Sequence, residues 1–414
     1  MNAATSSLET SAEPLGDAFD LLAAFRPPGV FFERRGVGVA GAGAVRTLAS
    51  ANLEELGGVV PLLRSIGRTG GGPAPVAAGA IGYDGEATRA HQLLVLRRAV
   101  RRGPGTGTWR LDTRDPDRRP DGPPPFERVA GGDPHEPFAD LQLEELPPAA
   151  GYRAAVAEAV ARIGRSDLRK VVLARTIQVH AGRTLDPRLL VHRLRAVDPD
   201  AYTFAAPTDD GVIVGASPEL LLAREGLEVR SNPLAGSAPR SGDPEEDRAN
   251  AAALLASGKE REEHAIVVEA VAETLRPRCA KLHWEPEPVL RETPNVWHLS
   301  TRFHGVLREP VPSALELVAS LHPTPAIAGA PTDAALALIR ELEPFDRGRY
   351  AGPVGWVDAN GDGEWAIALR CAELCSDRAT LYAGAGIVAG SDPAGELDET
   401  ERKFRAFLDP LRWG

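Results

Sequence analysis

Hydrophobic and polar positions follow regular periods most clearly between about residue 150 and the C-terminus. Residues 170–179 form a β-branched run typical of a strand, and residues 202–232 read as several consecutive strands joined by polar turns. Helical spacing recurs at residues 152–163, 185–197, 245–256, 259–275, 314–320 and 333–342. Further strand-like runs occur at 293–306, 354–357 and 366–372. Groups of strands followed by groups of helices favour an α+β fold over a regular βαβ repeat.

The first third of the chain is patterned more weakly. Residues 1–15 are polar, and we expect them to be disordered. Residues 102–149 are rich in Gly, Pro, Asp and Arg, a composition typical of a long loop. We therefore expect an N-terminal part at 16–149 that ends in this loop, followed by the region at 150–414 that carries the site.

The composition of the 414-residue chain is that of an ordinary globular protein, with 43% hydrophobic and 25% charged residues. A net charge of −11 argues against nucleic-acid binding, which requires a basic surface. No apolar run approaches the ~18 residues of a membrane span, and the N-terminus lacks the features of a signal peptide. The three cysteines form no CxxC pair, which is typical of reduced thiols in apolar surroundings. We expect a cytoplasmic protein without a membrane or nucleic-acid partner.

One short motif resembles a calcium-binding loop. Asp358, Asn360 and Asp362 occupy alternate positions before Gly363, as in the first half of such a loop. The twelfth position is Leu369, where the loop requires a bidentate glutamate. We therefore predict a hairpin turn at this point.

Two predicted helices each place a pair of carboxylates beside an apolar face. On the first, Glu263 lies in the middle of the apolar face and Glu260 lies one turn before it. A buried ionised glutamate requires a cation, a metal or the backbone N–H groups of the first helical turn. On the C-terminal helix, Glu396 and Glu399 share a stripe with Lys403. Together the two pairs are suited to hold Mg²⁺, whereas the alternative for the C-terminal helix is a solvated surface with an ordinary ion pair.

Four further polar residues lie within apolar segments. Lys170 begins a predicted strand, and it either extends its ammonium group towards water or acts as a desolvated base. Glu219 is either a turn carboxylate or a general acid whose pKa is raised by burial. For His298, the common alternative to a catalytic role is a core histidine with satisfied hydrogen bonds. Arg370 would be costly to bury without an anion, which makes a substrate carboxylate a reasonable partner.

Ten sequence blocks, in a fixed order, carry a resemblance to a known family. They are KVVLAR, GASPELL, SNPLAGSAPR, SGKEREEH, WHLST, LHPTPAIAG, RGRYAGPVGW, GEWAIALRCAEL, YAGAGIVAGS and ELDETERK. In these blocks the chain resembles the chorismate-utilising enzymes, a family that includes isochorismate, salicylate, anthranilate and aminodeoxychorismate synthases. The resemblance implies one large α+β domain, in which two antiparallel sheets face each other with helices packed outside, and Mg²⁺ as cofactor.

The resemblance also implies roles for the two carboxylate pairs. Glu263 and Glu399 would bind the metal, and Glu260 and Glu396 would hold its water ligands. The metal would bind the ring carboxylate of chorismate, which Lys403 would also contact.

Other residues are implied to bind the rest of the substrate. Arg370 and Tyr350 would hold the enolpyruvyl carboxylate, helped by the segment around Gly384. Part of the substrate site would be formed by the PLAGS block, with Leu234, Ala235, Gly236 and Ser237.

Within the family, the chain is most similar to the isochorismate synthases. Lys170 stands where members that use ammonia lack a lysine, and a base is needed there when the nucleophile is water. Ala235 stands where the aminodeoxychorismate branch often carries a nucleophilic lysine. Ser237 stands where salicylate synthases usually have threonine.

The implied reaction is isomerisation of chorismate to isochorismate, by attack of water at C2 and loss of the C4 hydroxyl. Lys170 would activate the water, Glu219 would protonate the departing hydroxyl, and His298 would orient the ring or its hydroxyl. The product would feed catechol siderophore or menaquinone biosynthesis, and we expect a monomer without a glutaminase subunit. Two alternatives stay open: a salicylate synthase that goes on to eliminate pyruvate, and a non-catalytic chorismate-binding subunit.

Overall fold

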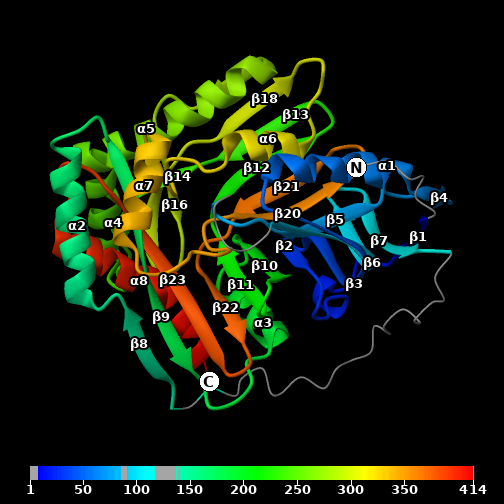
Figure 1. The fold of residues 1–414 in the computed structure, drawn as a ribbon, viewed down its shortest axis with the longest axis horizontal. Helices are drawn as coiled ribbons and strands as arrows, with labels where there is room; N and C mark the ends of the chain where they lie inside the picture. Colours follow the sequence, from blue (N-terminus) through cyan, green and yellow to red (C-terminus); the bar gives the residue numbers. More distant parts are fainter. Residues whose placement is uncertain (1–7, 85–90, 117–136, 139, 414) are drawn as a thin grey trace.

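The computed structural model describes residues 8–84, 91–116, 137–138 and 140–413 (Figure 1). Within these ranges, hydrogen bonding joins twenty strands into one large sheet. A separate three-stranded sheet consists of β14 (Leu234–Pro239), β17 (Val296–Ser300) and β16 (Val289–Glu292), in that order. Large antiparallel sheets combined with helices in one domain confirm the predicted α+β class.

The large sheet comprises β1 (Glu9–Leu15), β2 (Phe31–Arg34), β3 (Val37–Ser50), β4 (Gly67–Thr69), β5 (Val76–Ala80), β6 (His91–Gly103), β7 (Gly107–Arg114), β8 (Gln142–Leu146), β9 (Lys170–His180), β10 (Tyr202–Pro207), β11 (Val212–Ser217), β12 (Leu220–Glu225), β13 (Glu228–Asn232), β15 (Cys279–Trp284), β18 (Phe303–Leu307), β19 (Gly329–Ala330), β20 (Pro353–Asp358), β21 (Gly363–Ile367), β22 (Cys371–Cys375) and β23 (Arg378–Ile387). The long pairing of β9 with β23 is antiparallel, and β1 pairs in parallel with β4.

The helices are α1 (Val59–Ser65), α2 (Ala149–Ile163), α3 (Pro187–Val197), α4 (Pro244–Ala256), α5 (Gly258–Leu275), α6 (Ala314–Leu321), α7 (Thr332–Leu342) and α8 (Pro393–Arg412). Helix α8 packs on β23 and α2, α7 packs on β9, and α4 and α5 pack on β14. In Figure 1 these helices lie on one side of the molecule, and the N-terminal strands lie on the other. None of the helices in the described ranges is long and apolar enough to cross a membrane.

The two helices that carry the predicted carboxylate pairs begin at clear capping residues. The Ser257 side chain accepts a hydrogen bond from the backbone N–H of Glu260 at the start of α5. The Asp392 side chain accepts one from Gly395 N, at 2.8 Å, at the start of α8. Such caps satisfy N–H groups that a helix leaves free. They fix the first turns of both helices, which carry Glu260 and Glu396.

The expectation that residues 1–15 are disordered was wrong for residues 9–15, which form β1. This strand pairs antiparallel with β7, and the hydroxyl groups of Thr10 and Thr113 lie 2.9 Å apart. Arg114 also forms an ion pair with Glu9, at 2.8 Å. Cross-strand partners of complementary charge stabilise a strand that its own composition does not favour. Residues 1–7 lie outside the described residues.

The predicted loop at 102–149 is also only partly correct. It contains the end of β6, all of β7 and β8, and the start of α2. Residues 117–136 and 139 lie outside the described part of the chain. The residues of β8 are mostly exposed, so the strand lacks the alternation of hydrophobic and polar residues by which strands are predicted from sequence.

The calcium-like motif forms a hairpin turn between β20 and β21, as predicted. One Asp358 carboxylate oxygen accepts hydrogen bonds from the backbone N–H groups of Asn360 and Asp362, at 2.8 and 3.1 Å. The other oxygen forms an ion pair with Arg101, at 2.9 Å. These bonds stabilise the turn and occupy both carboxylate oxygens of Asp358, the first residue of the calcium-like motif.

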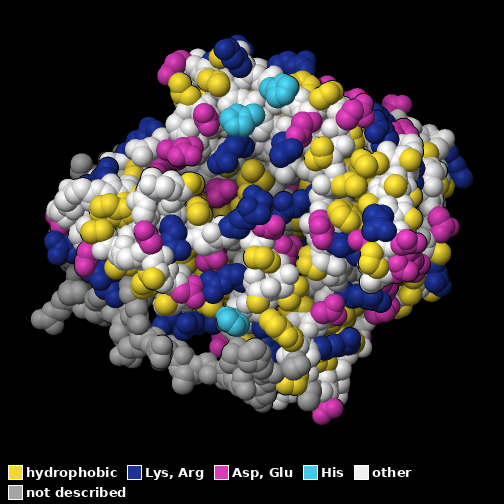
Figure 2. Space-filling model, turned by 180° about the vertical axis from the view of Figure 1, so that it is seen from behind, with side chains coloured by type: hydrophobic (Ala, Val, Ile, Leu, Met, Phe, Trp, Pro, Cys, Tyr) yellow, Lys and Arg dark blue, Asp and Glu magenta, His cyan; other side chains and the backbone are white. Residues whose placement is uncertain are grey.

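The distribution of charged side chains and the state of the cysteines can be compared with what the composition predicts. On the face shown in Figure 2, Lys and Arg side chains are interspersed with Asp and Glu side chains. Cys279 and Cys371 are free and buried, as expected for reduced thiols in apolar surroundings. Cys375 is free but exposed, so the expected apolar surroundings do not apply to it.

Candidate active site

A cavity with about 580 Å³ of open space collects most of the predicted site residues. Its walls come from the turn before β12, strands β14, β17 and β23, the bend before β22, and helices α5 and α8. The predicted residues that line it are Glu219, Leu234, Ala235, Gly236, Ser237, Glu263, His298, Tyr350, Arg370, Gly384, Glu399 and Lys403. Segments separated by more than 180 residues in the sequence thus meet at one site.

The three remaining predicted residues contact this lining. Lys170 is 0% exposed, and its Nζ atom lies 3.0 Å from a carboxylate oxygen of Glu263. Glu260 accepts a hydrogen bond from the backbone N–H of Ser237, at 3.1 Å. Glu396 lies at the start of α8, one turn before the cavity-lining residue Glu399. The structure therefore brings all the predicted site residues into one region.

Three lysines form ion pairs with the four carboxylates of this region. Lys170 pairs with Glu263, and Lys403 pairs with Glu399. The third lysine, Lys259, lies 2.7 Å from Glu396 and 3.2 Å from Glu260, so it joins the first turns of α5 and α8. The predicted i,i+4 ion pair of α8 is present, but it lies in the cavity wall and not on a solvated surface.

The two carboxylates of α8 differ strongly in acidity. Burial and the nearby charge of Glu399 raise the pKa of Glu396 to about 7. Burial also acts on Glu399, but Lys403 and a hydrogen bond from Ser237 outweigh it and lower the pKa of Glu399 to about 2. At neutral pH Glu399 is therefore ionised, which a metal ligand requires.

The donor set of this region suits a hard divalent cation. Four carboxylates against three ammonium groups leave a formal charge of −1, and carboxylate oxygens are the ligands that Mg²⁺ prefers. A Cβ atom at Gly386 would lie 2.1 Å from Glu263 Oε1, so only glycine leaves room for this carboxylate. Within the described ranges, however, no three acidic, histidine or cysteine side chains are grouped closely enough to hold an ion. Each of the four carboxylates is instead paired with a lysine.

Glu219 is a buried residue that lines the cavity, and Lys170 is a buried residue behind the lining residue Glu263. Lys170 is the first residue of β9, whose neighbour Val172 lines the cavity. Glu219 is 3% exposed, and burial raises its pKa to about 7, against the opposing effect of the Leu234 backbone N–H and of Lys170. A carboxyl group with this pKa is partly protonated at neutral pH and is able to donate a proton.

Arg370 and Tyr350 line a further part of the cavity. Arg370 Nη2 lies 2.9 Å from His298 Nε2, and its backbone adopts a left-handed φ of 51°. The Tyr350 ring stacks on Tyr382 with centroids 5.0 Å apart. A Cβ atom at Gly384 would lie 3.0 Å from the Tyr350 hydroxyl, which explains the need for glycine there.

The sequence reading missed two charged residues of this region. Arg347 lines the cavity, forms a buried ion pair with Glu343, and donates hydrogen bonds to the carbonyls of Val172 and Ile327 at 2.7 and 2.8 Å. Lys259 was the second. Its position at a helix N-terminus is a usable signal, because the helix dipole disfavours a cation there unless an anion compensates it.

The chain is similar to several proteins of one known family. The chain matches the family model described as chorismate binding enzyme over residues 130–412. It is 46% identical over 273 residues to the isochorismate synthase DhbC of Bacillus subtilis, covering 64% of this chain and 69% of that protein. It is 44% identical over 270 residues to the isochorismate synthase EntC of Escherichia coli K12, covering 65% and 69%. The crystal structure of DhbC from Bacillus anthracis is similar, with a TM-score of 0.81, 36% identity, and coverage of 95% of this chain and 99% of that one.

Proposed function

The chain belongs to the chorismate-binding enzymes, and from this premise we propose that it isomerises chorismate to isochorismate in a magnesium-dependent reaction. The observation that carries the proposal is the pair of buried groups at one cavity. Lys170 is fully buried beside it, and Glu219, whose pKa is raised by burial to about 7, lines it. One supplies a base and the other an acid, which is what exchange of a hydroxyl group between two ring carbons needs.

Each of the two groups has one task in the proposed reaction. Lys170, in its unprotonated form and released from its ion pair with Glu263, removes a proton from a water molecule as the water oxygen bonds to C2 of the ring. The ring double bonds shift, the C4–O bond breaks, and protonated Glu219 donates its proton to the departing oxygen, which leaves as water. One water is consumed and one is released, and the proton left on Lys170 returns to Glu219 through solvent, so that the net change is an isomerisation.

The same region would hold Mg²⁺ and the ring carboxylate. Glu263 and Glu399 would bind the ion, with Glu260 and Glu396 holding its water ligands. When bound, Mg²⁺ would neutralise negative charge on the ring carboxylate. Lys403 would also contact that carboxylate; in support, Lys403 lines the cavity, and its ammonium group donates to the Gly384 carbonyl at 2.8 Å.

Another part of the same cavity would hold the enolpyruvyl group. Arg370 and Tyr350 would bind its carboxylate, because a guanidinium group suits bidentate contact with two carboxylate oxygens. The substrate ring would lie against the segment that runs from Leu234 to Ser237, which lines the cavity. Isochorismate made here would serve catechol siderophore or menaquinone biosynthesis.

Incubation of the purified protein with chorismate and Mg²⁺, followed by chromatography of the products, tests this proposal. We expect isochorismate without release of pyruvate, and we expect none from the Lys170→Ala variant. Pyruvate and salicylate in equal amounts would identify a salicylate synthase instead. Binding of chorismate without any product would identify a non-catalytic binding protein.

A further inference from the structure

We propose that His298 acts as a positioning residue, which holds the Arg370 guanidinium towards the cavity so that it meets the carboxylate of the substrate side chain. This inference rests on the proposed function and deepens it. It replaces the catalytic role expected for His298 with a role exerted through Arg370.

Both ring nitrogens of His298 have hydrogen-bond partners, and these partners are compatible with only one tautomer of the ring. Nε2 lies 2.9 Å from Arg370 Nη2, and a guanidinium group has only donors, so Nε2 must accept. Nδ1 lies 3.1 Å from the Gly236 carbonyl oxygen, which only accepts, so Nδ1 must carry the hydrogen. The ring is therefore neutral, with its one hydrogen directed at the backbone. Burial and Arg370 lower the pKa of His298 to about 3, in agreement with this state.

A neutral ring in this arrangement is poorly suited to proton transfer. Its only hydrogen serves the backbone of the segment against which the substrate ring is proposed to lie, and its only lone pair serves Arg370. An acid or base needs a free position directed at the substrate. The two contacts instead connect β17, the Gly236 segment of β14 and the bend before β22.

Arg370 borders two cavities, so the side that its guanidinium group faces has to be fixed. It lines the main cavity together with Pro218, and both residues also line a second, smaller cavity. The second cavity extends to Leu194 and Val197 of α3 and to Ala406 of α8. His298 lines the main cavity and is not part of the second. Its hydrogen bond therefore holds the guanidinium on the side where the substrate is proposed to bind.

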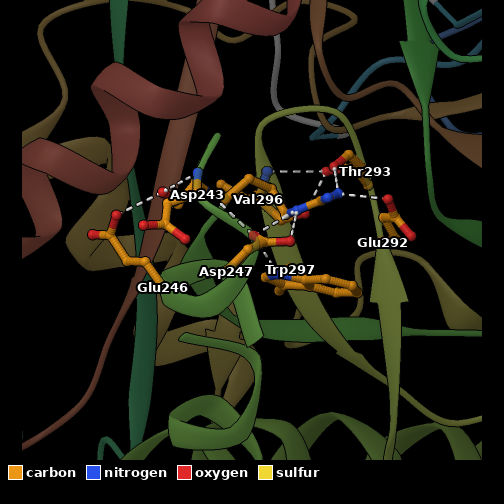
Figure 3. Close-up of polar contacts among 9 residues, drawn as sticks. Asp243, Glu246, Asp247, Glu292, Thr293, Val296 and Trp297 are labelled. Carbon is orange, nitrogen blue, oxygen red and sulfur yellow. Dashed lines mark hydrogen bonds and ion pairs between the residues drawn. The ribbon is translucent and has the colours of Figure 1, made fainter. Parts of the chain in front are cut away.

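The strand that carries His298 is itself held firmly. Figure 3 shows the neighbouring Trp297 beside Asp247, and the Trp297 Nε1 atom donates to Asp247 at 3.0 Å. Arg240, at the end of β14, bonds to Asp247, to Glu292 at 2.8 Å and to the Thr293 carbonyl at 3.0 Å. This network ties the three-stranded sheet to α4. It therefore fixes the position of the strand from which His298 contacts Arg370.

Two substitutions separate the two contacts of the ring. In His298→Gln the side-chain amide reaches the place of Nε2 and still offers an acceptor to Arg370. In His298→Asn the shorter amide reaches the place of Nδ1, keeps the bond to Gly236, and leaves Arg370 without its acceptor. We expect calorimetric binding of chorismate, in the presence of Mg²⁺, to weaken about 10-fold or more in His298→Asn and clearly less in His298→Gln.

A double-mutant cycle with Arg370→Met shows whether the effect passes through the guanidinium. In that background, His298→Asn should weaken chorismate binding by less than about 2-fold, because the group that it positions is already absent. Thermal unfolding of each variant controls for loss of the fold.

Three results would count against the proposal. Equal weakening in the Gln and Asn variants would overturn it, as would additive effects with Arg370→Met. Unchanged binding with abolished turnover in both variants would restore a role in chemistry. A wild-type protein that binds no chorismate at all would refute the proposed function itself, which keeps the two failures distinguishable.

Discussion

Replacing the proposed acid, Glu219, by glutamine should stabilise the protein while it removes activity. Burial raises the pKa of Glu219 from 4.5 to about 7. The folded state therefore holds this proton more tightly than the unfolded state does. In the wild type, the stability that comes from this tighter proton binding is fully present below pH 4.5 and is lost as the pH rises towards 7. Glutamine does not ionise, so its variant avoids the loss.

The magnitude follows from the difference in pKa. The pKa of Glu219 differs by about 2.5 between the folded and unfolded states, and one pKa unit corresponds to about 1.4 kcal/mol. The free energy of unfolding of the wild type is therefore lower by roughly 3 kcal/mol at pH 8. Because the side chain is 3% exposed, little of this is screened by solvent. For 414 residues, an unfolding entropy of ~2.1 cal/mol/K per residue converts it to about 3 °C in Tm.

Scanning calorimetry at pH 5 and pH 8 measures this effect. The Tm of Glu219→Gln should exceed that of the wild type by about 3 °C at pH 8 and by less than 1 °C at pH 5. Glu225→Gln, an exposed change on the adjoining strand β12, is the matched control and should change Tm at neither pH. If the difference in Tm between Glu219→Gln and the wild type is the same at pH 8 as at pH 5, burial does not raise the pKa of Glu219 and the reasoning is refuted.

Three other changes probe separate parts of the account. Lys170→Met should lower the rate of isochorismate formation by about 10²- to 10⁴-fold while chorismate still binds, and a rate within 10-fold of wild type would exclude Lys170 as the base. Glu263→Gln should weaken Mg²⁺ binding in calorimetry by about 10-fold or more, whereas Asp398→Asn, an exposed change on α8, should not; equal Mg²⁺ affinity in both variants would remove Glu263 from the metal site. Glu343→Gln leaves Arg347, which is 3% exposed, without its anion, so the free energy of unfolding should fall by about 3 kcal/mol; a loss below 1 kcal/mol in chemical denaturation would contradict this.

The sequence predicted best the elements that have strong local signals. The helix at 259–275 and the strand at 170–179 agree with α5 and β9 to within one residue at each end. The apolar stripe of α5 correctly placed Glu263 in the buried face. The weakest predictions concerned β1, β7 and β8, whose residues form strands because of partners elsewhere in the chain. Their stability arises from pairing across long sequence separations, which periodicity does not contain.

The site residues were identified largely through the family resemblance, but their mutual contacts were not predictable. Lys259 lies beside Glu396, which follows it by 137 positions. Arg370 contacts His298, which precedes it by 72 positions. Tertiary packing alone decides such pairs. As a result, the sequence suggested a catalytic role for His298, and only the occupied state of both ring nitrogens indicated a positioning role.

The source of the new hydroxyl group tests the central claim most directly. If chorismate is converted in H₂¹⁸O, attack of water at C2 predicts isochorismate that carries one ¹⁸O atom, located by mass spectrometry and NMR in the C2 hydroxyl group. Transfer of the original C4 hydroxyl within the substrate would leave the product unlabelled and would contradict the roles assigned to Lys170 and Glu219.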